Sequence, residues 1–310
     1  MSSCPIWLRQ LLILGQAHRM HVLVTGANSQ LAQALAHTQA SFQGLQVIFA
    51  PKSALDITNL AQVRAYLQDH AIDYLINCAA YTQVDEAEHD QASAFAVNTV
   101  GPQYLASLAQ AMNFTLLHIS TDHVFGGEIA HPYTESMLAR PVNYYGQSKL
   151  AGEKAILAHN PAAYIIRTAW LYRGIGNNFL TRFVNKASKQ NTISMVYDQI
   201  GSPTYADDLA MAIWAIITKL HHAPKQYLPG IYHYANEGVA SRYDFAWAIK
   251  QYASLDCQLI PGLSKALPQV AARPAYSVLN KDKIKKTFDL TIAHWQDSLS
   301  DCMQQFNTIP

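Results

Sequence analysis

The chain has 310 residues, of which 50 % are hydrophobic and 14 % are charged, close to the composition of an average globular protein. The 22 Lys and Arg residues balance 21 Asp and Glu residues, and this near-neutral charge argues against a nucleic-acid-binding protein. No apolar run is long enough to span a bilayer, and the four cysteines and 13 histidines show no metal-ligand spacing. We therefore expect a cytoplasmic protein with no membrane partner, no nucleic-acid partner and no bound metal.

Short apolar runs alternate with helical patterns through the first half of the chain. We predict strands over 21–25, 46–50, 73–77, 115–120 and 163–168. Between them, the periodicity predicts helices over 31–37, 59–69, 91–112 and 151–159. This alternation is typical of βαβ units, so the predicted fold is a Rossmann-type, doubly wound α/β protein with a parallel sheet. Ligands of such sheets bind at the carboxyl ends of the strands.

Glycine and proline become more frequent after residue 173, which indicates shorter elements. We predict that residues 20–172 form a dinucleotide-binding Rossmann domain and that a later helix, at about 196–222, packs back on it. Residues 173–195 and 223–310 are predicted to form a smaller mixed lobe that binds the substrate. Residues 1–19 are predicted to be an extension outside the core, because Met20 stands directly before the first strand.

A glycine turn follows the first predicted strand, as in dinucleotide-binding folds. Of the three positions that carry glycine in such turns, only Gly26 is a glycine, and Ser29 and Ala32 take the other two. The Ser29 hydroxyl could donate a hydrogen bond to a phosphate. A turn that only caps the following helix is the alternative interpretation.

The end of the second predicted strand bears on the choice of cofactor. An NAD-specific site carries an acidic residue there for the ribose 2′-hydroxyl, whereas this sequence has Lys52 nearby and no acid. A lysine can pair with a 2′-phosphate, so the sequence favours NADPH. Lysine is also common on surface loops, and NADH stays open.

A tyrosine and a lysine lie four residues apart, which places Tyr145 and Lys149 on one face of a predicted helix. We expect the lysine ammonium to lower the tyrosine pKa from its usual value of about 10. Such a pair also occurs by chance, so its position matters. Thr121 ends a strand upstream, where its hydroxyl could bind the same carbonyl oxygen. The turn, the hydroxyl and the pair together predict a hydride-transfer site.

Several longer motifs support this interpretation. From about residue 20 to residue 295, the sequence resembles the extended short-chain dehydrogenase/reductase family, and most closely its sugar-nucleotide reductases. The motifs that carry the resemblance are VLVTGANSQLA (22–32), NCAAYTQVDEAE (77–88), ISTDHVFG (119–126), PVNYYGQSKLAGE (141–153), DQIGSPTYADDL (198–209) and RPAYSVL (273–279).

The resemblance implies a role for individual residues. Tyr145 would donate the proton, Lys149 would assist it and bind the ribose, and Thr121 would lie near the reacting carbonyl. For Trp170, which would contact the sugar nucleotide, ordinary packing in the hydrophobic core is the alternative interpretation. The cofactor contacts are expected at Gly26, Ser29, Gln30, Leu31, Lys52, Asp56, Ile57, Ala80, Tyr81 and Thr82, and the sugar-nucleotide contacts at Thr121, Asp122, His123, Trp170, Asn178 and Arg273.

The implied reaction is the reduction by NADPH of the C4 ketone of dTDP-4-dehydro-β-L-rhamnose to dTDP-β-L-rhamnose, the last step in making this precursor of surface polysaccharide such as O-antigen. The implied partner is the dTDP-sugar, and a homodimer is a further expectation. Other sugar-nucleotide reductases and epimerases stay open. A dehydratase is disfavoured because those relatives carry an acid at the position of His123, where the reductases usually have tyrosine. A non-catalytic subunit resembling the β subunit of methionine adenosyltransferase is the alternative from another class, although the intact Tyr145–Lys149 pair and Thr121 argue against it.

Overall fold

The structure is a computed structural model and describes residues 19–267 and 269–308. The extension predicted at 1–19 lies outside the described residues, apart from Arg19. None of the helices in this described part is long and apolar enough to cross a membrane.

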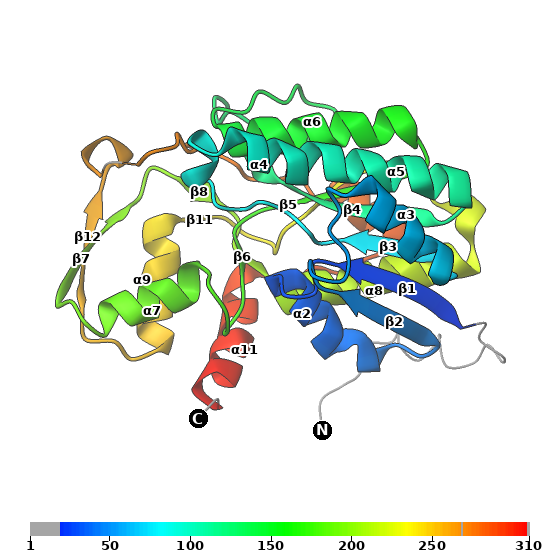
Figure 1. Ribbon diagram of the computed structural model, residues 1–310. Helices are drawn as coiled ribbons and strands as arrows, with labels where there is room; N and C mark the ends of the chain where they lie inside the picture. Colours follow the sequence, from blue (N-terminus) through cyan, green and yellow to red (C-terminus); the bar gives the residue numbers. More distant parts are fainter. Residues whose placement is uncertain (1–18, 268, 309–310) are drawn as a thin grey trace.

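A six-stranded parallel sheet forms the centre of the molecule (Figure 1). Every neighbouring pair in it is parallel, and β1 lies between β2 and β3. The direction of winding reverses between β1 and β3, which makes the sheet doubly wound and confirms the predicted fold class. In spatial order the strands are β2 (Leu45–Ala50), β1 (Met20–Thr25), β3 (Tyr74–Asn77), β4 (Thr115–Thr121), β5 (Tyr164–Thr168) and β10 (Gly230–Tyr234).

Helices cover both faces of this sheet (Figure 1). Alternate side chains of a strand point to opposite faces, so Val22 and Val24 pack in one core while Leu23 packs in the other. The core with the two valines lies under α2 (Gln30–Thr38), α8 (Ala206–His222) and α10 (Asp282–Phe288). The opposite core lies under α3 (Leu60–Asp69), α5 (Gly101–Met112) and α6 (Tyr144–His159).

The helical stretch predicted over 91–112 is interrupted in the structure. It consists of α4 (Gln91–Phe95), a π-helical turn (Ala96–Val100) and α5. The Asn98 side chain lies in this π-turn. It accepts a hydrogen bond from the Tyr81 backbone amide at 2.9 Å and donates to the Tyr81 carbonyl at 3.0 Å. It also donates to Ser148 Oγ at 3.0 Å. The turn thereby ties the loop after β3 to helix α6.

A third hydrophobic core lies beside the sheet, on the left in Figure 1. It is built from α7 (Phe179–Ala187), α9 (Arg242–Tyr252), α11 (Trp295–Thr308) and the parallel pair β7 (Thr192–Val196) and β12 (Gln258–Gly262). Two short pairs connect it to the rest of the chain: β6 (Leu171–Tyr172) with β9 (Thr204–Tyr205), and β8 (Ile200–Gly201) with β11 (Ala240–Ser241).

The predicted division into a domain and a lobe stays a prediction. Two elements from the segment predicted for the lobe, β10 and α10, belong to the main sheet and its cover. Helix α8 also packs on this sheet, so the chain crosses between the two parts several times.

Candidate active site

A cavity of about 720 Å³ opens at the carboxyl ends of the sheet strands. Its walls come from the loops after β1 and β3, the ends of β4 and β5, helix α6, and the segments that begin α7 and α9. Its size lies within the range of small-molecule sites, and it occupies the side of the sheet where ligands of doubly wound folds bind.

This cavity brings together all but one of the predicted site residues. The exception is Arg273, which donates to Asp85 Oδ2 at 2.9 Å and to the Ala271 carbonyl at 2.7 Å. Its contact with a substrate stays a prediction. Asn178 lines the cavity, but its side-chain amide donates to the carbonyls of Arg173 and Ile175 at the start of α7. The role predicted for it also stays a prediction.

The glycine turn depends on the one glycine that the sequence retains. Gly26 has a φ of +67°, and a Cβ atom there would lie 2.8 Å from the Ala79 backbone. Ser29 begins helix α2, and its Oγ accepts a hydrogen bond from the Ala32 amide at 3.2 Å. Ser29 therefore caps the helix and lines the cavity at once, so the capping interpretation and a phosphate-binding turn are compatible. Residues 29–31 at the start of α2 line the cavity, and the free amides of a helix N-terminus can bind an anion.

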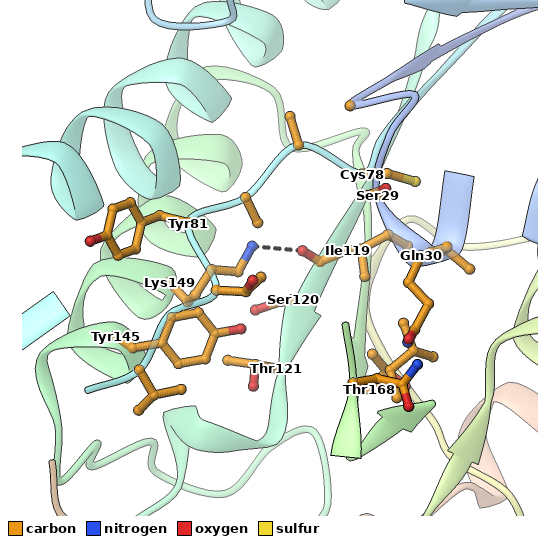
Figure 2. A pocket seen from close by; sticks show the side chains of 18 of the residues that line it. Ser29, Gln30, Cys78, Tyr81, Ile119, Ser120, Thr121, Tyr145, Lys149 and Thr168 are labelled. Carbon is orange, nitrogen blue, oxygen red and sulfur yellow. Dashed lines mark hydrogen bonds between the residues drawn. The ribbon is translucent and has the colours of Figure 1, made fainter. Parts of the chain in front are cut away.

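Tyr145 and Thr121 meet at the end of β4, where Figure 2 shows the phenol pointing toward the ends of Ser120 and Thr121. The Thr121 hydroxyl donates to Asp122 Oδ1 at 3.1 Å and accepts from the His123 amide at 3.2 Å. Close packing makes this meeting possible, because a Cβ on Gly146 would lie 2.2 Å from the His123 carbonyl oxygen.

Lys149 does not tune Tyr145 in the expected way, and that prediction was wrong. Lys149 reaches past the phenol, and its Nζ donates to the Ile119 carbonyl at 2.7 Å (Figure 2). Burial raises the pKa of Tyr145 to about 12, although a hydrogen bond with Thr121 opposes the shift. The phenol is therefore protonated at neutral pH, which is the form that can donate a proton.

Several polar atoms in the cavity have no partner. Buried side-chain atoms that lack a hydrogen bond within the described part of the chain include Gln30 Oε1, Asp122 Oδ2 and Thr168 Oγ1, and all three residues line the cavity. Buried polar atoms normally have a partner, so these atoms indicate a site for a polar ligand.

Two arginines that the sequence analysis did not identify, Arg182 and Arg242, line the far end of the cavity. The guanidinium of Arg242 lies 3.5 Å from the centre of the Trp170 ring, and burial lowers the pKa of Arg242 to about 9. Neither arginine forms an ion pair with a carboxylate in the described residues. No motif marks these positions, since only tertiary packing brings α7 and α9 to the cavity. Unpaired guanidinium groups suit a phosphate.

Trp170 also lines the cavity rather than the core alone. Its backbone takes a left-handed conformation with φ of 47°, which is uncommon for a side chain of this size. A Cβ on Gly201 would lie 2.5 Å from the indole ring, so the glycine leaves room for it. The tryptophan is thus wedged between Gly201 and Arg242.

No group of three or more His, Cys, Asp or Glu residues that could hold a metal ion occurs within the residues that the structure describes.

Comparisons with known proteins show the family to which the chain belongs. The family model described as "RmlD substrate binding domain" matches residues 20–308. A dTDP-4-dehydrorhamnose reductase of Mycolicibacterium smegmatis is 40 % identical over 285 residues, covering 91 % of this chain and 84 % of that protein. The crystal structure of such a reductase from Clostridium acetobutylicum has a TM-score of 0.87 at 34 % identity, covering 93 % and 100 % of the two chains. The reductase from Bacillus anthracis, solved in complex with NADP, has a TM-score of 0.85 at 35 % identity, with 93 % and 99 % covered.

Proposed function

Because this chain belongs to the family of the RmlD substrate-binding domain, we propose that it is an NADPH-dependent reductase that converts dTDP-4-dehydro-β-L-rhamnose to dTDP-β-L-rhamnose. The names of the relatives supply the reaction, and the meeting of Tyr145 and Thr121 in a cavity with unpaired polar atoms supports it most directly. A non-catalytic nucleotide-binding subunit would not need this arrangement.

The turn side of the cavity fits a dinucleotide. Gly26 and the start of α2 can hold a pyrophosphate, and Asp56 and Ile57, which line the same cavity, are proposed to contact the adenine. Lys52 forms a surface ion pair with Asp56 at 3.8 Å, but its side chain is 78 % exposed, so a 2′-phosphate can reach its charge. NADPH is the proposed cofactor because the B. anthracis relative was solved with NADP. A faster reaction with NADH than with NADPH would contradict the preference.

The proposed chemistry assigns one task to each group. When bound, the reduced cofactor supplies a hydride to the C4 carbonyl carbon. The Thr121 hydroxyl orients the carbonyl oxygen, and Tyr145 transfers its phenolic proton to that oxygen, which yields the alcohol. Lys149 is placed to bind the ribose. Arg182 and Arg242, which line the cavity, are proposed to bind the diphosphate of the sugar nucleotide, and Trp170 to form a wall of the pocket.

The proposal also covers the cellular compartment and the oligomeric state of the enzyme. We infer a cytoplasmic enzyme, in keeping with three free, buried thiols at Cys78, Cys257 and Cys302. A homodimer stays a prediction that sedimentation analysis can test.

The experiment is NADPH oxidation with the dTDP-4-keto sugar as substrate. Tyr145→Phe should lower kcat by about 10²- to 10⁴-fold, because it removes the proton donor and keeps the ring. Tyr144→Phe is the matched control, since Tyr144 is its neighbour on α6 and does not line the cavity. Equal rates for Tyr145→Phe and the parent protein would remove Tyr145 from the mechanism.

A further inference from the structure

His118 lies beneath the proposed catalytic site and has no task in the proposed chemistry. It is fully buried on β4, with one ring nitrogen 2.9 Å from the side-chain amide nitrogen of Asn77 and the other 3.1 Å from Lys149 Nζ. Both neighbours are ordinarily hydrogen-bond donors, whereas a neutral imidazole has one donor and one acceptor. The contacts therefore restrict where the protons lie.

The orientation of Asn77 is fixed by its other contacts. Its Oδ1 accepts from the Thr25 hydroxyl at 2.6 Å and from the Ala79 backbone amide at 3.2 Å. A backbone amide can only donate, so the oxygen of Asn77 must face Ala79. The Asn77 amide nitrogen then faces His118 and donates to Nδ1.

Since Nδ1 accepts, the single proton of neutral His118 must lie on Nε2, which faces Lys149. Burial alone disfavours the charged ring and holds the pKa of His118 well below its ordinary value, so a doubly protonated ring is excluded. A lysine ammonium has no lone pair with which to accept from Nε2–H. A neutral amine does, and it can still donate to the Ile119 carbonyl.

Glu153 is the main surrounding charge that opposes a neutral lysine, but other groups share that charge. Glu153, the carboxylate that faces Lys149, is bound by the Arg167 guanidinium at 2.6 and 2.9 Å, and Ser120 also donates to it. Burial raises the pKa of the nearby Cys78 thiol, and Tyr145 is likewise a neutral phenol. The Glu153 charge is therefore shared with Arg167, which weakens its hold on an ammonium.

We propose that His118 is a positioning residue that, at mildly alkaline pH, keeps Lys149 as a neutral amine until a bound ligand draws the lysine away. This inference rests on the proposed function only for the identity of that ligand, a nicotinamide dinucleotide. Burial also lowers the pKa of Lys149 to about 8, so the neutral amine is accessible under mildly alkaline conditions. A lysine that leaves His118 for the ribose hydroxyls regains its usual basicity and takes up a proton.

The proton positions can be read directly by ¹⁵N NMR of the ligand-free protein at pH 9, labelled at histidine. His118→Phe identifies the signal of the ring. The inference predicts a neutral ring with its proton on Nε2. A proton on Nδ1, or a doubly protonated ring, would overturn it, whatever the activity of the protein.

The second test is calorimetry of NADP⁺ binding at pH 9 in two buffers of different ionisation enthalpy. The parent protein should take up close to one proton, because the cofactor phosphates are fully ionised and only Lys149 changes. His118→Gln offers a carbonyl oxygen to the ammonium, so it should take up markedly less. His159→Gln, at the exposed end of helix α6, should match the parent. Equal uptake by parent and His118→Gln would overturn the inference, whereas no binding by any variant would instead contradict the proposed function.

Discussion

Lys149 is surrounded by the β4 backbone, His118 and the buried ends of the strands, and only 2 % of it is exposed. The sequence predicted its position on the same helix face as Tyr145 but not its protonation. That property depends on burial and on the His118 contact, which join residues 31 positions apart in the chain. Arg182 and Arg242 were missed for the same reason, because no spacing rule connects them to the cavity.

The buried lysine should make stability depend on pH. Its pKa falls from 10.5 in the unfolded chain to about 8 when folded, so its stabilising contribution is complete above pH 10.5 and is lost as the pH falls through 8. A shift of this size corresponds to about 3 kcal/mol. The free energy of unfolding of Lys149→Met, minus that of the parent protein, should therefore be about 3 kcal/mol larger at pH 7 than at pH 10.5.

Urea unfolding of both proteins at the two pH values measures this difference, and the comparison cancels the other titrating groups. Lys149→Met should also lose reductase activity. A stability difference that does not change with pH would show that Lys149 titrates normally in the folded protein.

At the scale of elements, helix α6 carries both Tyr145 and Lys149 and is held by two close contacts. Gly146 approaches the loop after β4, and Gly152 approaches the π-turn, where a Cβ would lie 2.0 Å from the Asn98 carbonyl oxygen. The sequence predicted helix throughout 91–112, because the inserted residue of a π-turn barely changes the apolar period. Long-range bonds of Asn98 to Tyr81 and Ser148 fix the turn, and these are not visible in the local sequence.

Gly152→Ala should destabilise the protein by about 1–3 kcal/mol, through overpacking against the π-turn. A loss of stability would be informative, because alanine in place of glycine normally stabilises a helix by about 1 kcal/mol. Gly262→Ala is the control, since its Cβ would meet Leu267 at an ordinary 3.6 Å. Thermal unfolding measures both, and a Gly152→Ala variant as stable as the parent would contradict the close packing of α6.

Helix α9 delivers Arg242 to the cavity from its first turn. Arg242→Gln should raise KM for the dTDP-sugar by about tenfold to a hundredfold, because a hydrogen bond to a charged group contributes about 1.5–3 kcal/mol. KM for NADPH should stay unchanged, since the arginine lies at the opposite end of the cavity. Arg64→Gln, on the exposed side of α3, should leave both constants unchanged. A rise confined to KM for NADPH would place the sugar nucleotide elsewhere.

At the scale of the whole molecule, the alternation of strands and helices predicted the doubly wound sheet, and the carboxyl ends of its strands hold the site. The sixth strand, β10, was not predicted. Residues 230–234 follow a proline- and glycine-rich stretch like those that interrupt the chain elsewhere after residue 173, so no strand pattern stands out there. Its place beside β5 is decided by packing under α8 and α10. The cavity needs both parts of the chain, since the turn after β1 and the starts of α7 and α9 line it together.

The most direct test of the account follows the hydride itself. The dTDP-4-keto sugar is incubated with the protein and with NADPH that carries deuterium at the transferred position, and the product is analysed by NMR and mass spectrometry. We expect dTDP-β-L-rhamnose with deuterium at C4 and one cofactor oxidised for each ketone reduced. A product without deuterium at C4, or a ketone left unreduced while the cofactor binds, would contradict it.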